Sequence, residues 1–183
     1  MEVLRTISLY AESKNIGFMV IGGHALNYYG ISRQTGDIDL VVRRSEKDQW
    51  HQLLSRLRYE VGQHDDRFGR FKPQFLGSWP IDLMFVDDPT FDKLVQQAED
   101  GEIGIAEVKV VSARHLATMK IHALKHYQAH RAAKDYNDLV GLLRGGKTGL
   151  SRSELKELCV RYASEELFLR LAKDVAIEEN GKT

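Results

Sequence analysis

The sequence predicts a mixed α/β (α+β) fold, with a mixed β-sheet flanked by helices in the first part of the chain and a helical region in the second. Two observations lead to this prediction. Over residues 1–111, short apolar runs of strand length alternate with segments in which apolar residues recur at helical spacing. From Ser112 onward, helical spacing dominates. We therefore expect a core over residues 1–111 and a C-terminal helical region over residues 112–183.

Each expected element of the core rests on periodicity or on a turn signal. Strands are expected where apolar runs are short and bounded by glycine, proline or polar residues. In chain order, we expect a helix over residues 3–13, a strand over 17–23, a brief helix over 24–30, a strand over 37–42, a helix capped by Ser45, a β-hairpin over 67–86 with its turn at 77–80, a short helix opening at Thr90 and a strand over 106–112.

The helical region is expected to begin with a helix that Ser112 caps. The segment GGKTG, residues 145–149, breaks the helical pattern. In order, the expected helices cover residues 113–127, 131–144, 151–162 and 164–177.

Composition limits the classes of protein. Twenty-six basic and twenty-six acidic side chains cancel, so binding to nucleic acid would have to rest on a local patch. The single cysteine, Cys159, excludes an internal disulfide and a cysteine-rich zinc site. The amino terminus lacks the apolar core of a signal peptide and no segment has transmembrane length. We expect a cytoplasmic protein with no membrane partner.

Two carboxylates on one expected strand are the first sign of chemistry. Side chains alternate along a strand, so Asp37 and Asp39 project from the same face while Ile38 points to the other. Like charges this close repel unless a cation lies between them, and Mg²⁺ prefers carboxylate oxygens. The pair therefore favours a metal site.

A third carboxylate, Asp82, interrupts the apolar run PIDLMFV. Burying an unpaired charge there is costly, so a partner or a metal is expected. If strand 81–86 lies beside strand 37–42, the three acids converge as two-metal phosphoryl transfer requires. The alternative is that all three face solvent on a one-sided sheet.

A glycine turn precedes the acids. Gly22 and Gly23 follow a buried strand and open a helix, so their backbone N–H groups can hold a phosphate with no side chain in the way. Gly-Gly alone is common in turns. The order is more specific: a strand, Gly-Gly, a short helix, Arg33 and Thr35, then Asp-x-Asp and a later single Asp.

This order resembles the nucleotidyltransferase fold of the DNA polymerase β superfamily, and most closely its AbiEii-like branch of abortive-infection and toxin–antitoxin proteins. The resemblance is carried over residues 19–42, by PIDLMF, and more loosely by Lys120 and KDYNDL. The residues that match the first motif are Gly22, Gly23, His24, Ala25, Leu26, Gly30, Arg33, Thr35, Asp37, Ile38, Asp39 and Leu40.

The resemblance implies roles for these residues. Asp37 and Asp39 would bind two Mg²⁺ (or Mn²⁺) ions, and Asp82 would complete the catalytic-metal site and help activate the acceptor hydroxyl. Gly22 and Gly23 would cradle the phosphates of a nucleoside triphosphate such as ATP, with Arg33 and Thr35 steadying the turn or the phosphates. Many relatives carry serine where this chain has Gly23. The phosphate grip would then depend on backbone and basic side chains.

Lys120 lies within the apolar stripe of the helix expected over residues 113–127. It either extends outward past its neighbours or reaches the triphosphate, which the nucleotidyltransferase interpretation favours. Asp135 and Asp138 are expected to form a helix-surface ion-pair set with Arg131. The resemblance offers a second role for them, in shaping the active site.

Two further features have two interpretations each, and a third is a weak signal for a metal site. His24 either donates to a phosphate or is a solvent-exposed residue at a helix start. The segment RFGRFK, residues 67–72, is either a basic and aromatic rim for an RNA or nucleotide acceptor, or an exposed hairpin. The histidines of the tail have helical spacing that can bind a transition metal, but no carboxylate or cysteine accompanies them; they are His115, His122, His126 and His130.

The sequence thus predicts a metal-dependent nucleotidyltransferase that moves an NMP from an NTP to an acceptor hydroxyl on tRNA, protein or a small molecule, releasing pyrophosphate. One alternative is a non-catalytic nucleotide- or partner-binding component of a toxin–antitoxin pair, with a cognate antitoxin or toxin as partner. Another is a structural domain whose acids only solvate a sheet face. The sequence does not select the nucleotide base or the acceptor.

Overall fold

The computed structural model describes residues 2–125 and 129–175, which form two compact units. The first unit contains the described residues of 1–28 together with 33–111. The second contains 29–32 together with the described residues of 112–183. The short segment 29–32, which the sequence analysis assigned to the core, therefore groups with the helical unit.

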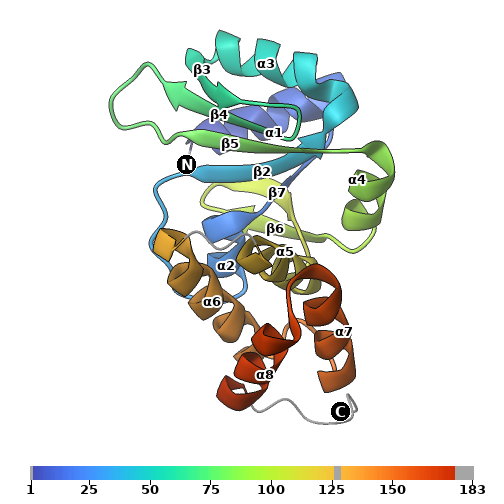
Figure 1. Cartoon of the computed structure of the whole chain (residues 1–183). Helices are drawn as coiled ribbons and strands as arrows, with labels where there is room; N and C mark the ends of the chain where they lie inside the picture. Colours follow the sequence, from blue (N-terminus) through green and yellow to red (C-terminus); the bar gives the residue numbers. More distant parts are fainter. Residues whose placement is uncertain (1, 126–128, 176–183) are drawn as a thin grey trace. The chain divides into compact units, whose positions relative to one another are not determined.

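The first unit is built on a seven-stranded mixed sheet with the strand order β3-β4-β5-β2-β1-β7-β6 (Figure 1). Its strands are β1 (Phe18–Val20), β2 (Ile38–Arg43), β3 (Tyr59–His64), β4 (Phe68–Pro73), β5 (Ile81–Val86), β6 (Glu99–Ile103) and β7 (Ala106–Val110). Its helices are α1 (Glu2–Lys14), α2 (Gly22–Tyr28), α3 (Lys47–Arg56) and α4 (Asp88–Val95), with a 3-10 turn, η1 (Arg44–Glu46), before α3.

The pairing of the central strands positions the acids. Strand β2 pairs in parallel with β5 and antiparallel with β1. The prediction that strand 81–86 lies beside strand 37–42 is confirmed, as Figure 1 shows for β5 and β2. Strand β4 pairs antiparallel with β5 on its other side, so the predicted hairpin over residues 67–86 is present.

Two strands were not expected from the sequence. β3 and β6 are the outermost strands of the sheet, and all residues of β3 except Tyr59 are exposed. An edge strand that faces water does not need the apolar alternation from which strands are predicted. β6 was missed for the same reason, because its acidic sequence, EDGEI, lacks an apolar alternation.

Two expected helix caps were wrong. Ser45 lies in η1, and its hydroxyl donates to Asp88 Oδ1 at 2.7 Å instead of capping α3. The helix expected to open at Thr90 begins at Asp88, because Asp87 is the cap and its carboxylate accepts the Thr90 N–H at 2.8 Å. At α4 an aspartate thus takes the role assigned to a hydroxyl, whereas the N-cap of α3 is Glu46, whose side chain makes no capping hydrogen bond.

The core of the first unit lies on the inner strands and the helices that pack on them. Helix α1 packs on β7, α2 and α4 pack on β2, and α3 packs on β3. Large side chains without exposed surface come from α1, β1, β2, α3, β4 and β5, among them Leu4, Met19, Leu40, Trp50 and Phe71. This packing fixes β2 and β5, the strands that carry the acids.

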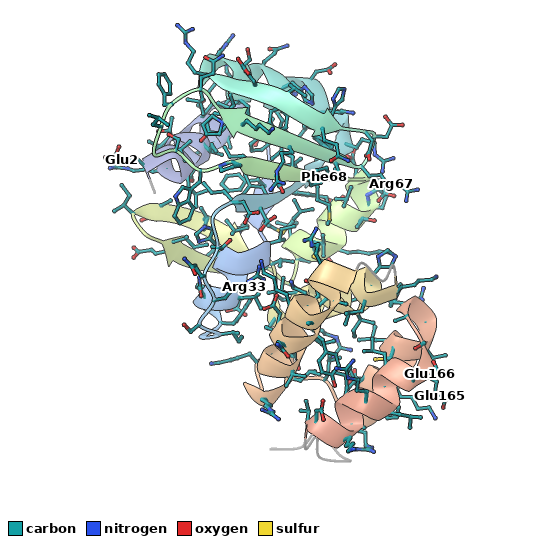
Figure 2. The ribbon with its side chains drawn as sticks, turned by 60° about the vertical axis from the view of Figure 1, so that its left-hand side comes forward. Glu2, Arg33, Arg67, Phe68, Glu165 and Glu166 are labelled. Carbon is teal, nitrogen blue, oxygen red and sulfur yellow. The ribbon has the colours of Figure 1, made fainter. Side chains whose placement is uncertain are left out.

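The second unit is helical where it is described. Its helices are α5 (Ala113–Lys125), α6 (Ala129–Arg144), α7 (Arg152–Tyr162) and α8 (Glu165–Asp174), and Figure 2 labels Glu165 and Glu166 at the start of α8. Ser112 accepts the backbone N–H of His115 at 3.3 Å, as expected of a cap for α5. The expected ends of two helices, at residue 127 and at residues 176–177, lie outside the described residues. Within the described ranges no helix is long and apolar enough to span a membrane.

Candidate active site

The two strand aspartates face each other across a parallel pair. Asp39 on β2 stands directly opposite Asp82 on β5. On the far side of β5, Arg70 of β4 stands directly opposite Asp82. Because residues in register project from the same face of a sheet, Arg70, Asp82 and Asp39 form a row across three adjacent strands.

Asp37 joins this row from just outside the sheet. β2 begins at Ile38, one residue later than expected, and the Ile38 N–H donates to the Pro80 carbonyl at 2.9 Å. One carboxylate oxygen from each of Asp37, Asp39 and Asp82 lies within 4.8 Å of the others, and all three residues are half-buried. The structure therefore brings the three predicted acids together.

The acidic cluster of Asp37, Asp39 and Asp82 fits a hard divalent cation. It offers oxygen donors only, which is the ligand type that Mg²⁺ and Mn²⁺ take in proteins. Three carboxylates this close repel strongly without a compensating charge. The half-buried setting leaves the three side chains partly accessible from solvent, which is compatible with a metal site that also takes a substrate.

The glycine turn lies against the cluster. Gly22 has a φ of +63°, and a Cβ built on it would overlap the carboxylate of Asp39. A Cβ on Gly23 would lie 2.6 Å from the Thr35 side chain. Both positions thus require glycine, and the backbone of the turn approaches the acids closely.

Thr35 connects the glycine turn to the first acid. Its hydroxyl donates to Asp37 Oδ1 at 2.8 Å, so it restrains the orientation of that carboxylate. Arg33 is fixed through its backbone, because its N–H donates to Asn27 Oδ1 at 2.8 Å and its carbonyl accepts from Asn27 Nδ2 at 2.9 Å. Figure 2 labels Arg33 beside α2, the helix that begins at Gly22.

Arg70 is a member of the site that the sequence analysis did not identify. Its Nε donates to Asp82 Oδ1 at 2.9 Å, and its second terminal nitrogen lies 3.4 Å from Asp37 Oδ2. The Asp82 side chain is 12% exposed and that of Asp37 34%. The sequence did single out the segment RFGRFK, which contains Arg70. Only the register between β4 and β5 shows that Arg70 lies beside the acids.

His24 is buried, so the expectation of a solvent-exposed residue at a helix start is wrong. Its ring stacks on Trp79 with centroids 5.1 Å apart and its surface is 7% exposed. Burial lowers the pKa of His24, and the Asp37 carboxylate opposes that shift. The Tyr59 hydroxyl donates to the Trp79 carbonyl at 3.0 Å, which holds the covering ring in place.

Lys120 lies in the second unit, on α5, between two acids of α6. Its Nζ is 2.6 Å from Asp135 Oδ1 and 2.7 Å from Asp138 Oδ2. The two aspartates are 7% and 6% exposed, so the expectation that they form a surface set with Arg131 is wrong. The position of Lys120 in an apolar stripe is explained by this buried ion-pair network, since a buried charge needs partners.

The structure decides part of the question about the segment RFGRFK, residues 67–72, and about the tail histidines. Phe68 and Arg70 share the face of Asp82, whereas Phe71 is fully buried on the opposite face and cannot belong to a rim. Of the tail histidines, His126 and the side chain of His130 lie outside the described residues. Within the described ranges, the His, Cys, Asp and Glu side chains that meet as a group of three are those of the acidic cluster.

The family comparison matches nearly the whole chain. Residues 3–180 match the sequence family described as "Nucleotidyl transferase AbiEii toxin, Type IV TA system". The chain belongs to the AbiEii nucleotidyltransferase family. No curated protein matches it. The predicted resemblance to AbiEii-like nucleotidyltransferases is thus confirmed.

Solved structures share the fold of this AbiEii family member. An antigenic nucleotidyltransferase-like protein from Paracoccidioides brasiliensis is 20% identical, with a TM-score of 0.59, 98% of this chain covered and 96% of the other. The antibiotic-resistance factor ANT(2'')-Ia is 15% identical, with a TM-score of 0.62 and coverages of 89% and 90%. A protein from Thermotoga maritima described as a "putative nucleotidyltransferase" is 14% identical, with a TM-score of 0.54 and coverages of 75% and 92%. The nucleotidyltransferase fold predicted from the sequence is confirmed.

Proposed function

We propose that this AbiEii family member is a divalent-metal-dependent nucleotidyltransferase. It transfers a nucleoside monophosphate from an NTP to an acceptor hydroxyl. The bond that forms joins the acceptor oxygen to the α-phosphorus, the bond that breaks joins this phosphorus to the bridging oxygen, and pyrophosphate leaves. The observation that supports this proposal is the convergence of Asp37, Asp39 and Asp82 from two neighbouring strands.

The acids have separate tasks in the proposed reaction. Asp37 and Asp39 would hold both Mg²⁺ (or Mn²⁺) ions, and Asp82 would hold one of them. When bound, the ions neutralise charge on the phosphates and favour ionisation of the acceptor hydroxyl. Asp82 lies on the side of the cluster farther from β1 and its glycine turn. It is therefore the acid proposed to orient the acceptor hydroxyl and take its proton.

The glycine turn is the proposed phosphate cradle. Gly22 and Gly23 lie against Asp39 and Thr35, so a triphosphate at the turn would be within reach of the cluster. Thr35, which restrains Asp37, and Arg33 are proposed to steady this arrangement. Lys120 is proposed as a further contact of the triphosphate, in addition to its ion pairs with Asp135 and Asp138.

The acceptor and the partners belong to the same proposal. An RNA, a protein side chain or a small hydroxyl compound fits the chemistry. The description of the family as a type IV toxin–antitoxin system supports a cognate antitoxin as partner. A cytoplasmic location is part of this proposal.

The direct test is label transfer. The purified protein is incubated with each α-labelled NTP, Mg²⁺, and separate pools of tRNA, protein and small hydroxyl compounds. We expect that one of the labelled NTPs transfers its label to one of the three pools. Labelling should fall at least about a hundredfold in Asp39→Asn, since removing one group that contributes to the stabilisation of transition-state charge typically lowers the rate by about 10²–10³.

A carboxylate outside the site provides the matched control. Asp66 belongs to the same unit and its side chain is 96% exposed, so Asp66→Asn removes the same charge and should retain full transfer. Label transfer that survives Asp39→Asn would contradict the proposal. Nucleotide binding without transfer to any pool would favour the non-catalytic alternative instead.

A further inference from the structure

Arg70 occupies a fixed place in the row of charged residues. It stands opposite Asp82, which in turn stands opposite Asp39. Adjacent strands are about 4.8 Å apart, so register alone brings the Arg70 side chain to the acids. The pairing is thus built into the β4–β5 hairpin and does not depend on a flexible loop.

Arg70 contacts two acids, and its contact with Asp82 is shorter than its contact with Asp37. With Asp82 it makes a short hydrogen bond through Nε, at 2.9 Å, to a side chain that is 12% exposed. With Asp37 it makes a longer contact, at 3.4 Å, to a side chain that is 34% exposed. A guanidinium fork can serve two carboxylates at once, and here the contact with Asp37 is the weaker one.

The charge of the cluster explains why a cation is needed there. Three carboxylates have oxygens within 4.8 Å of one another, and their mutual repulsion opposes the pairing of β2 with β5. An exposed ion pair contributes little to stability. A half-buried guanidinium between two members of an acidic cluster lowers that repulsion, and it does so by contacting two of the carboxylates that a metal would use.

We propose that Arg70 is the internal counter-ion of the acidic cluster. It neutralises Asp82 and Asp37, and a divalent cation binds at the acids by displacing its contact with Asp37 while the contact with Asp82 is kept. Arg70 is therefore a positioning residue that sets the affinity of the site for its metal. This inference rests on the proposed function, because it assumes that the acids bind a divalent cation.

The test measures metal binding and does not need the acceptor. Mn²⁺ is titrated into the protein and the free ion is followed by electron paramagnetic resonance. Removing a positive charge next to a cation site favours the cation, so we expect Arg70→Gln to lower the Kd for Mn²⁺ about three- to tenfold, a range set by partial exposure and salt screening. With a chelator, the same variant should unfold at a lower temperature than the wild type, and Mn²⁺ should raise that temperature more than in the wild type.

A second variant separates charge from geometry. Arg70→Lys keeps the positive charge but lacks the fork that reaches both acids, so its Kd should lie between those of Arg70→Gln and the wild type. It also carries the test if Arg70→Gln does not fold. Arg67 is the matched control, because it is exposed, precedes the same strand and is labelled at the margin of the sheet in Figure 2. Arg67→Gln should change the Kd by less than about twofold.

Two results would overturn the inference, and they bear differently on the proposed function. A Kd for Mn²⁺ that is unchanged or higher in both Arg70 variants would mean that Arg70 does not compete with the metal. The proposed function would then stand, with Arg70 only supporting the orientation of Asp82. If neither the wild type nor any variant binds Mn²⁺, both the inference and the metal dependence of the proposed function are wrong.

Discussion

The backbone of Gly22 lies directly against the carboxylate of Asp39. A Cβ at position 22 would overlap Oδ2, Cγ and Cβ of that aspartate, and the φ of +63° at Gly22 disfavours any other residue. The glycine is therefore required for two independent reasons. Its absence of a side chain leaves room for the acid, and its conformational freedom allows the chain to turn into α2.

Gly22→Ala should disrupt the site. The new methyl group must push Asp39 aside, and the positive φ adds about 1–2 kcal/mol of strain. We expect a lower unfolding temperature and a Kd for Mn²⁺ at least about tenfold higher. Calorimetry and a Mn²⁺ titration measure the two effects.

Gly36→Ala is the control for this glycine. Position 36 lies one residue before Asp37, but a Cβ there meets no atom within 4 Å. This variant should bind Mn²⁺ like the wild type. Equal behaviour of the two glycine variants would show that the close approach of Gly22 to Asp39 has no functional effect.

Thr35→Val should weaken metal binding with little change in stability. Valine has the shape of threonine but cannot donate to Asp37 Oδ1, so the carboxylate loses one restraint. The expected loss of stability is about 0.5–1.5 kcal/mol, the usual value of one hydrogen bond. A several-fold higher Kd for Mn²⁺ is expected from the loss of an outer-shell contact. Thr6→Val removes a comparable hydrogen bond on α1, at 3.1 Å from the Glu2 carbonyl, and should leave the Kd unchanged.

Lys120→Met should destabilise the second unit. It leaves Asp135 and Asp138, which have only 10% and 7% of their side chains exposed, without their shared cation. Breaking a buried ion pair from one side costs about 3–5 kcal/mol. Thermal unfolding followed by circular dichroism measures the effect. The exposed pair of Lys156 and Glu165 is the comparison, and Lys156→Met should cost no more than about 1 kcal/mol.

The proposed phosphate contact of Lys120 needs a variant that still folds. Replacing Lys120 by methionine together with Asp135→Asn and Asp138→Asn removes the positive charge together with the two negative charges that it balances. If Lys120 also binds the triphosphate, this variant should bind NTP about tenfold more weakly, the effect of losing one charge-assisted contact. An unchanged NTP affinity in the folded triple variant would restrict Lys120 to its structural network.

Protonation of His51 should lower the stability of the protein in acid. Its ring lies against Phe71 and Phe85, with centroids 5.1 and 6.2 Å away. Burial lowers its pKa from the ordinary value of 6.5, with smaller contributions from Lys47 and His64 in the same direction and from Asp48 in the opposite one. A lowered folded pKa means that the stabilisation is present above pH 6.5 and is lost as the pH falls through the folded pKa.

The measurement is the free energy of unfolding as a function of pH. His51→Gln removes the titrating ring, so its stability should decline less than that of the wild type between about pH 7 and pH 5. His122→Gln, at an exposed position of α5, should follow the wild type. Parallel curves for His51→Gln and the wild type would contradict the assignment.

The sequence predicted the inner part of the sheet and missed its edges. The strands carrying the acids were predicted because their buried positions must be apolar, which made Asp39 and Asp82 conspicuous. The edge strands β3 and β6 need no such pattern. Both outcomes have one cause, the apolar pattern of buried strands. A charged residue is conspicuous where this pattern is present, and a strand is hard to recognise where the pattern is absent.

Arg70 was missed because local composition does not determine the register between β4 and β5. A turn centred on residues 77–80 would pair Arg70 with Asp87, beyond the end of β5. The actual connection starts at Gln74, right after β4 ends at Pro73, and this brings Arg70 opposite Asp82. Likewise, neither the burial of His24 nor that of Asp135 follows from periodicity, because each depends on a specific partner in another segment, Trp79 and Lys120 respectively.

The placement of Arg70 on the same hairpin as Asp82 also bears on how the sheet assembles. These two residues are only twelve positions apart in the chain, so their contact can form while the hairpin is still a local structure. The hairpin must then dock in parallel beside β2, bringing an acid next to Asp39 across a long stretch of chain. Because Arg70 already pairs with Asp82, the hairpin brings less uncompensated negative charge to Asp39. Like-charge repulsion therefore opposes the docking of the hairpin less than it would without Arg70.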